Sequence, residues 1–244
     1  MEKKSPKVSI IMNCYNCESF LEEAINSIYE QTFLDWEIIF LDNASTDRSA
    51  NIADKYDQKL KYYRIQKNVH LGKARNLAMQ KATGKYIAFL DCDDLYFKDK
   101  LAKQAEMMDT QKFVMSYGGA LLIDKNGQNL KKIFPEIKSG DIFGRLLLKY
   151  EINMQSVMLL RSFILKNNLS FPEGFQYGPD YDLFTTIASK CKVGVLGDLI
   201  VKTRIHSNAL THKKLHRVRD ELKSTIDRLV IGDSKLKKRF DKEL

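Results

Sequence analysis

The sequence predicts an α/β fold with a mostly parallel central sheet flanked by helices and a helical extension at the C-terminus. Three observations support this prediction. Strand and helix patterns alternate through the first 110 residues, the strand segments are apolar on both faces, and polar residues gather directly after the strands. Strands that are buried on both faces are typical of parallel sheets covered by helices. A chain of 244 residues has room for one substantial domain and a small appendage.

The elements of the first half follow from the spacing of the apolar residues. Short apolar, partly β-branched runs predict strands, and apolar positions three or four residues apart predict helices. The predicted strands are 7–12, 36–41, 61–65 and 86–90. The predicted helices are 18–31, a segment capped by Ser45 or Thr46 that ends near residue 56, 73–81 and 98–109.

After residue 110 the pattern becomes mixed, and we expect the second half to continue the first sheet. Strands are expected at 113–117, 120–123, 157–160, 193–196 and 199–205, and helices at 140–150 and 181–189. The pair Asn126-Gly127 favours a tight hairpin turn.

Basic charge is concentrated near the C-terminus. The chain has 40 Lys and Arg against 31 Asp and Glu, and residues 201–244 alone hold 13 of the former and six of the latter. An amphipathic helix is predicted over 213–230. Its apolar side consists of Leu215, Val218, Leu222, Ile226 and Leu229. Such uneven charge argues against a nucleic-acid-binding domain. It leaves two alternatives, a helix that docks on the rest of the chain or one that contacts an anionic membrane.

Composition also predicts the compartment. No apolar run approaches the about 20 residues that a membrane-spanning helix needs, and the apolar stretch 8–12 is too short for a secretory signal. We therefore expect a cytoplasmic protein. Cys14 and Cys17 form a C-x-x-C pair without the second pair that structural zinc needs. We expect these two, with Cys92 and Cys191, to be free thiols.

Three carboxylates follow the strand predicted at 86–90, namely Asp91, Asp93 and Asp94. Like charges this close raise one another's pKa, and a hard divalent cation that also binds phosphates would relieve the conflict. The alternative is a polar turn in which Asp94 caps the next helix. The sequence has neither a P-loop nor a strand-linked G-x-G-x-x-G. A bound diphosphate would therefore be held by metal and side chains.

Six blocks resemble, in order, the motifs of family-2 glycosyltransferases with the GT-A fold. They are VSIIMNCYN at 8–16, QTF…WEIIFLDNASTD at 31–47, N…GKARN at 68–76, GKYIAFLDCDD at 84–94, PDYDLF at 179–184 and RIH at 204–206. Each block alone is a weak signal, but the ordered set is highly specific. The resemblance implies a GT-A catalytic domain over 1–207, with a nucleotide-binding half (1–110) and an acceptor-binding half (111–207). A basic amphipathic helical extension, 208–244, would follow it.

The resemblance further implies a metal-dependent inverting glycosyltransferase with Mn²⁺ or Mg²⁺ as cofactor. It would move a sugar from a nucleotide-diphosphate donor, with UDP-sugar favoured, to a hydroxyl of a glycan or lipid-linked acceptor. Bacterial surface polysaccharide or lipopolysaccharide synthesis at the inner face of the membrane would be its setting. The main alternative is an inactive nucleotide-sugar-binding protein on the same scaffold. A nucleotidyltransferase would need a glycine-rich triphosphate loop, which this sequence lacks.

The family pattern assigns the donor site residue by residue. Asp93, the last Asp of D-x-D, is the expected direct metal ligand. Asp91 is expected near the ribose or in the metal shell, and His206 is expected to complete that shell. Asn13 and Tyr15 are placed where the nucleobase packs.

The same family pattern assigns the catalytic base. Asp180 matches the family's catalytic base, which removes the acceptor hydroxyl proton during direct displacement at the anomeric carbon. Asp182 is a rival for this role or a helix cap. Arg75 is expected either to contact the nucleotide or to form an ion pair that supports its loop.

The sequence departs from the family motifs at three places. These departures affect which donor is expected to bind more than they affect the expected reaction. Asn13 and Cys14 replace Pro and Thr. Asn43 replaces the Asp that contacts the nucleobase in the family, and Pro179 replaces a Glu. An Asn side chain both accepts and donates hydrogen bonds, so Asn43 could pair with the edge of uracil. The expected donor order is UDP-sugar, then dTDP-sugar, then GDP-sugar.

Overall fold

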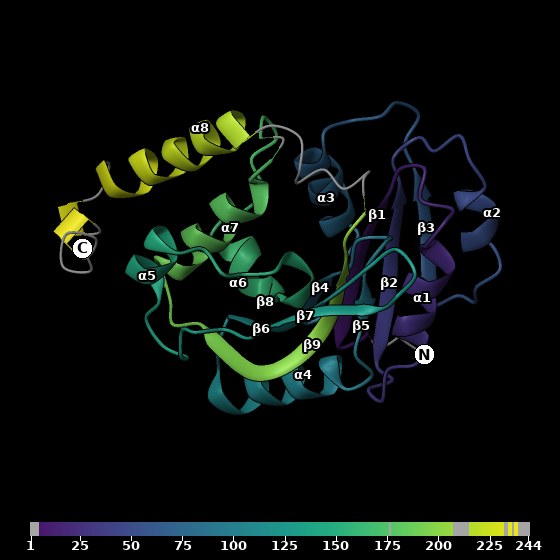
Figure 1. Cartoon of the computed structure of the whole chain (residues 1–244), viewed down its shortest axis with the longest axis horizontal. Helices are drawn as coiled ribbons and strands as arrows, with labels where there is room; N and C mark the ends of the chain where they lie inside the picture. Colours follow the sequence, from purple (N-terminus) through teal and green to yellow (C-terminus); the bar gives the residue numbers. More distant parts are fainter. Residues whose placement is uncertain (1–4, 176, 207–214, 232–233, 236, 239–244) are drawn as a thin grey trace.

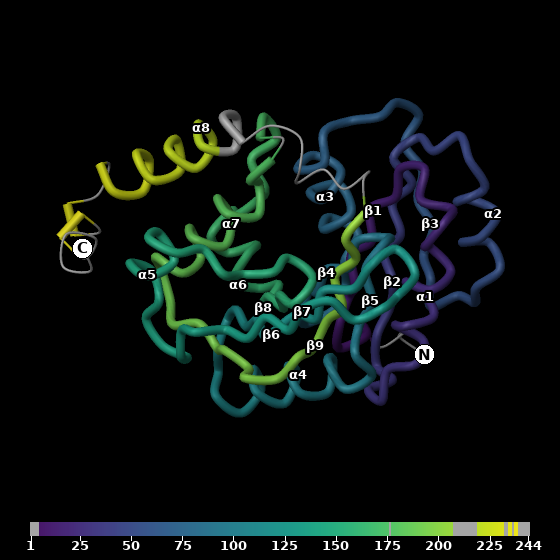
Figure 2. The backbone as a smooth tube through the Cα atoms, in the orientation of Figure 1, coloured from purple at the N-terminus to yellow at the C-terminus, as the bar shows by residue number. Residues whose placement is uncertain are grey.

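The computed structural model describes residues 5–175, 177–206, 215–231, 234–235 and 237–238, with the backbone alone at 215–218. A mixed sheet of nine strands lies between two layers of helices, and helix α8 (Leu215–Ile226) lies outside one of these layers (Figure 1). The tube in Figure 2 shows the N-terminal α/β half and the second half side by side, with β9 (Gly194–Arg204) running from one to the other.

The first half of the sheet is parallel, as the apolar strand patterns predict. Its strands are β1 (Val8–Cys14), β2 (Trp36–Asp42), β3 (Leu60–Arg64) and β4 (Tyr86–Phe89), in the order β3-β2-β1-β4. β1 pairs in parallel with both β2 and β4. The carboxyl ends of these central strands therefore meet at one edge, where ligands bind in open α/β sheets.

The second half extends the same sheet, largely through antiparallel pairs. β8 (Met158–Leu160) pairs with β4 and with β6 (Met115–Ile123), and β6 runs parallel to β9. Two short strands complete the sheet. These are β5 (Leu95–Tyr96) on β9 and β7 (Asn129–Ile133) on β6. The β6–β7 hairpin turns at the predicted Asn-Gly site.

The prediction of two separate strands at 113–117 and 120–123 was wrong, because β6 runs through Gly118 and Gly119. A β-carbon at Gly119 would lie 2.8 Å from the carbonyl oxygen of Ile133, so this glycine allows a close approach of the neighbouring strand. The register between β6 and β9 shifts on both sides of Gly119. β9 likewise joins the strands that we predicted at 193–196 and 199–205.

Two helical layers cover the sheet because successive side chains of each strand point to opposite faces. Val8, Ile10 and Met12 of β1 pack into one core and Ile11 into the other. The first core lies under α1 (Leu21–Tyr29), α2 (Ser49–Ala53) and α4 (Lys100–Gln111). The second lies under α3 (Leu71–Met79), α5 (Phe143–Leu148), α6 (Arg161–Lys166) and α7 (Pro179–Ala188).

The cap predicted for the second helix was wrong. α2 begins at Ser49, and neither Ser45 nor Thr46 caps it. The Asp47 carboxylate instead accepts hydrogen bonds from the backbone N–H groups of Ser49 and Glu18, at 3.0 and 2.9 Å. Asp47 thus joins the loop after β2 to the loop after β1.

α8 docks on the second helical layer. Leu222, Ile226, Leu229 and Val230 form a small core with Phe143, Leu147 and Tyr181. Leu222, Ile226 and Leu229 belong to the apolar stripe expected over 213–230, and they contact protein. Residues 213–214 and the side chains of Leu215 and Val218 lie outside the described part of the chain.

Among the described residues, no helix combines the length and the apolar character needed to cross a bilayer.

Candidate active site

Asp93 and His206 form a close pair beyond the ends of β4 and β9. The His206 Nε2 atom lies 2.9 Å from Asp93 Oδ2, and the His206 ring packs on Phe20 with 5.4 Å between centroids. Burial, together with the negative charge of Asp91, raises the pKa of Asp93, while His206 opposes this rise. These two residues, 113 positions apart in the sequence, offer one oxygen and one nitrogen ligand at a single point.

Arg204 stabilises the position of this pair through several hydrogen bonds. Its backbone N–H donates to Asp94 Oδ1 at 2.8 Å, and its guanidinium donates to the Asp93 carbonyl oxygen at 3.0 Å and to Glu23 at 2.7 Å. Burial raises the pKa of Asp94 well above its usual range. Asp94 therefore anchors β9, and the alternative in which it caps the next helix was wrong, because α4 begins after Asp99.

Asp91 points to a different set of partners. Its carboxylate accepts hydrogen bonds from Arg75 at 3.1 Å and from Gln155 at 2.7 Å, and its N–H donates back to Gln155. In the described part of the chain, Asp91 does not join Asp93 and His206 in a three-ligand cluster. Arg75 therefore makes the loop-supporting ion pair that was one of its two expected roles.

Asp180 lies in the first turn of α7, within reach of Arg75's charge. The Tyr150 hydroxyl donates to Asp180 Oδ2 at 3.0 Å. Burial raises the pKa of Asp180, and the positive charge of Arg75 and the Tyr150 bond oppose the rise. A half-buried carboxylate with a raised pKa is suited to accept a proton.

Asp182 has a separate, structural set of bonds. Its Oδ1 atom accepts hydrogen bonds from Thr225 at 2.8 Å and from Arg228 at 2.6 Å, both near the C-terminal end of α8. It makes no capping bond to α7, whose N-cap is Gly178. Of the two aspartates in this turn, only Asp180 is associated with Arg75.

Asn13, Tyr15 and Asn43 lie at the carboxyl ends of β1 and β2. The Asn13 side-chain nitrogen is buried and has no hydrogen-bond partner among the described residues, and Tyr15 is half exposed. Asn43 is buried, and both ends of its amide bond the backbone of Val69: Nδ2 donates to the carbonyl oxygen and Oδ1 accepts from the N–H, each at 2.9 Å. Asn43 thus holds the segment that leads into α3.

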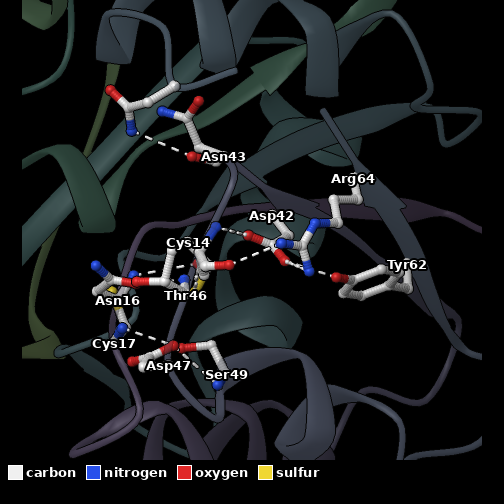
Figure 3. Close-up of polar contacts among 12 residues, drawn as sticks. Cys14, Asn16, Cys17, Asp42, Asn43, Thr46, Asp47, Ser49, Tyr62 and Arg64 are labelled. Atoms are coloured by element: carbon white, nitrogen blue, oxygen red, sulfur yellow. Dashed lines mark hydrogen bonds and ion pairs between the residues drawn. The ribbon is translucent and has the colours of Figure 1, made fainter. Parts of the chain in front are cut away.

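A polar network organises the loop around these residues (Figure 3). The fully buried Asp42 carboxylate accepts hydrogen bonds from the Tyr62 hydroxyl at 2.6 Å and from the Ser45 N–H at 2.7 Å, and it pairs with Arg64. The Asn16 side chain accepts a hydrogen bond from the Thr46 N–H. These bonds connect the loops that follow β1 and β2, which flank the candidate nucleobase site.

Sequence reasoning missed four supporting residues, Arg204, Gln155, Tyr150 and Glu221. Arg204 was noted only as part of a motif block, and the other three carry no local signal. Their roles depend on contacts across 30 or more positions of the chain, such as Gln155 with Asp91 at a separation of 64.

Glu221 on α8 fixes the backbone just before Asp180. Its Oε2 atom accepts hydrogen bonds from the N–H groups of Tyr177 and Gly178, at 2.9 and 2.8 Å. Glu221→Ala would leave both groups without this acceptor. We expect it to lower the free energy of unfolding by about 1–2 kcal/mol and to speed hydrogen exchange at residues 177–182.

Denaturant unfolding and hydrogen-exchange mass spectrometry measure the two effects. Asp220→Ala removes the same charge from the neighbouring, exposed position and is the matched control. Equal behaviour of the two variants would contradict the role of Glu221.

Comparisons with known proteins identify the family of the chain. Residues 9–169 match the family model described as glycosyl transferase family 2. An uncharacterized glycosyltransferase of Rickettsia felis is 34% identical over 207 residues, which cover 84% of this chain and 34% of that protein. The putative teichuronic acid biosynthesis glycosyltransferase TuaG of Bacillus subtilis is 36% identical over 135 residues, covering 54% of each chain. The chain thus spans about a third of the length of that Rickettsia relative.

Solved structures support the same fold class. The structure of Staphylococcus aureus TarS 1–349 in complex with UDP-GlcNAc aligns with a TM-score of 0.74 at 23% identity, over 91% of this chain and 66% of that 1–349 chain. Mannosyltransferase PcManGT of Pyrobaculum calidifontis, in complex with GDP-Man and Mn²⁺, aligns with a TM-score of 0.63 at 19% identity, over 85% and 59%. The predicted GT-A fold is confirmed by this likeness, and the family match shows that the chain belongs to glycosyl transferase family 2.

Proposed function

We propose that this protein is a metal-dependent inverting glycosyltransferase that uses a nucleotide-diphosphate sugar. The observation that carries the proposal is that one set of charged residues connects the Asp93–His206 pair with Asp180. The Asp93–His206 pair lies beside Asp91, and Asp91 is bonded to Arg75, whose charge also acts on Asp180. A metal-binding pair and a general base are the two elements that direct displacement at an anomeric carbon needs.

The donor atoms of the pair fit a divalent cation. Carboxylate oxygen suits Mg²⁺ and Mn²⁺, and an imidazole nitrogen is a better ligand for the transition metal than for Mg²⁺. We therefore infer Mn²⁺ at Asp93 and His206. When bound, the cation would neutralise charge on the leaving diphosphate. Asp91, which Arg75 and Gln155 orient, is assigned to the ribose side of the donor.

The protein's own groups would perform the remaining steps. Asp180 would accept the proton of the acceptor hydroxyl as that oxygen attacks the anomeric carbon from the face opposite the leaving diphosphate. The Tyr150 hydroxyl and the Arg75 charge favour the ionised form of Asp180, against the effect of burial on its pKa. Because a single displacement inverts the anomeric centre, no covalent sugar–enzyme bond is required.

We infer a UDP-sugar as the favoured donor, with dTDP-sugar and then GDP-sugar after it. The inference is supported by the complex of TarS with UDP-GlcNAc, whereas PcManGT binds GDP-Man. The bonds from Asn43 to Val69 mean that Asn43 shapes the base site by holding the backbone at residue 69. Among the described residues the buried side-chain nitrogen of Asn13 has no hydrogen-bond partner, and a ligand carbonyl would supply one.

For the acceptor we propose a hydroxyl of a glycan or lipid-linked glycan in bacterial surface polysaccharide synthesis. The name of the relative TuaG, which refers to teichuronic acid biosynthesis, supports this class. Contact with the inner face of the membrane would depend on the basic charge of residues 201–244, since the described part of the apolar stripe is packed on the protein. Each Lys or Arg near an anionic surface contributes about 1 kcal/mol.

The test is a titration of the full chain with UDP, dTDP, GDP, CMP and ADP, with and without Mn²⁺, by calorimetry. We expect UDP to bind most tightly, and only weakly without the metal. A parallel assay of UDP release from UDP-sugars separates an enzyme from an inactive binding protein, which would bind UDP without turning the sugar over. Tighter binding of GDP or CMP than of UDP would contradict the proposed donor, and metal-independent binding would contradict the metal site.

A further inference from the structure

Three of the four cysteines come together beside the candidate active site. The Sγ atoms of Cys14, Cys17 and Cys92 all lie within 4.8 Å of one another. Cys14 ends β1, Cys17 lies in the loop that follows, and Cys92 lies in the loop between β4 and β5. Cys14 and Cys92 are buried, and Cys17 is partly exposed. No local pattern of residues predicts this cluster, because Cys92 is 75 or more positions from the C-x-x-C pair.

The spacing of the three sulfurs suits a metal ion. Zn–S bonds are about 2.3 Å long, so two thiolates of a tetrahedral site lie about 3.8 Å apart. A contraction of at most about 1 Å from the observed spacing would close the site. None of the three is in a disulfide.

The surroundings of the cluster define the chemistry it would accept. The oxygen atoms that hydrogen-bond the three sulfurs are neutral: Ser45 Oγ lies 3.8 Å from the Cys14 sulfur, and the Cys17 and Cys92 thiols donate to the carbonyl oxygens of Tyr15 and Asn13. Sulfur ligands select soft ions such as Cu⁺ and Zn²⁺ and disfavour Mg²⁺ and Mn²⁺. The cluster therefore differs in kind from the Asp93–His206 pair.

We propose that Cys14, Cys17 and Cys92 form a binding site for a thiophilic d¹⁰ cation, Zn²⁺ or Cu⁺. The three thiols would release their protons to solvent as the sulfur–metal bonds form. Cu⁺ would be held by the three sulfurs alone. Zn²⁺ would take a fourth ligand, either Ser45 Oγ or a water molecule entering from the partly exposed side of Cys17. Because Cys92 lies between Asp91 and Asp93, the ion would fasten the D-x-D loop to the end of β1.

The test uses the full chain, kept reduced, with Cd²⁺ as a probe whose charge-transfer absorption reports bonds to thiolates. We expect one equivalent to bind with this absorption and to raise the melting temperature, since binding to the folded state alone stabilises it. Zn²⁺ and Cu⁺ should each displace the probe. Cys17→Ser should weaken binding at least about 10-fold, the scale of losing a group that supports a metal site.

Two control variants make the result specific. Cys191→Ser alters the one remaining cysteine, which is remote from the cluster in the sequence and outside it in the structure, and it should bind Cd²⁺ like the wild type. Asp93→Asn removes the other candidate metal ligand and should also keep the thiolate absorption. Circular dichroism checks that each variant is folded.

A second measurement does not depend on any variant. In the wild type, Zn²⁺ should slow the alkylation of Cys17 by iodoacetamide, read by peptide mass spectrometry, and should leave the alkylation rate of Cys191 unchanged. The proposal is overturned if the wild type shows no thiolate absorption, if Cys17→Ser binds as tightly as the wild type, or if Zn²⁺ gives Cys17 no protection.

Discussion

Asp93→Asn is expected to abolish glycosyl transfer while leaving the fold intact. The substitution replaces the carboxylate of the Asp93–His206 pair with a neutral amide of the same shape. Loss of groups that merely support metal ligands costs about 10–100-fold, so removal of a direct ligand should lower transfer by at least about 10²-fold. Calorimetry should show that UDP binding by this variant no longer depends on Mn²⁺. Circular dichroism should match the wild type, because Arg204 bonds the backbone carbonyl of Asp93 and not its side chain.

The matched control is Asp99→Asn, which neutralises a partly exposed carboxylate that forms an ion pair with Lys103. It should keep full activity. Full activity of Asp93→Asn, or of the wild type in excess EDTA, would show that the reaction does not need a metal.

Asp180→Asn is expected to retain donor binding and to lose about 10²–10⁴-fold in transfer rate, the usual range for loss of a general base. The amide cannot accept the acceptor proton, whereas the groups proposed to hold the nucleotide lie outside α7. Steady-state kinetics should therefore show the loss in kcat, with the affinity for UDP by calorimetry unchanged. Asp182→Asn is the comparison, since its carboxylate bonds Thr225 and Arg228. It should lower stability more than rate.

The pH profile gives an independent readout of the same base. Burial raises the pKa of Asp180, and only the ionised form can accept a proton. Transfer should therefore fall, as the pH is lowered, at a value above the about 3.9 of an ordinary Asp. Tyr150→Phe removes a hydrogen bond that favours the ionised form, so its acid limb should move to higher pH. A larger rate loss in Asp182→Asn than in Asp180→Asn would reassign the base.

Local sequence patterns predicted much of the fold. The β1, β2 and β4 segments are apolar on both faces, and this property alone predicts central parallel strands whose polar ends meet at one edge. Predictions failed where a residue's usual preference was overridden by its neighbours. Gly118 and Gly119 read as a strand break, but β6 continues through them. A β-carbon would meet the Ile200 side chain at Gly118 and the Ile133 carbonyl oxygen at Gly119, so both positions are packed closely against neighbouring strands.

The sequence by itself determined the fold class through its local apolar patterns. It made Asp93, His206 and Asp180 candidates through the resemblance of its ordered motifs to the family. Only the tertiary structure decided which groups meet. It placed Asp91 against Arg75 and Gln155, tied Asn43 to Val69, turned Asp182 toward α8, and brought Cys92 to the C-x-x-C pair. Each of these contacts joins separate segments of the chain. Their geometry is set by the packing of the sheet and helices as a whole, which no local pattern of residues encodes.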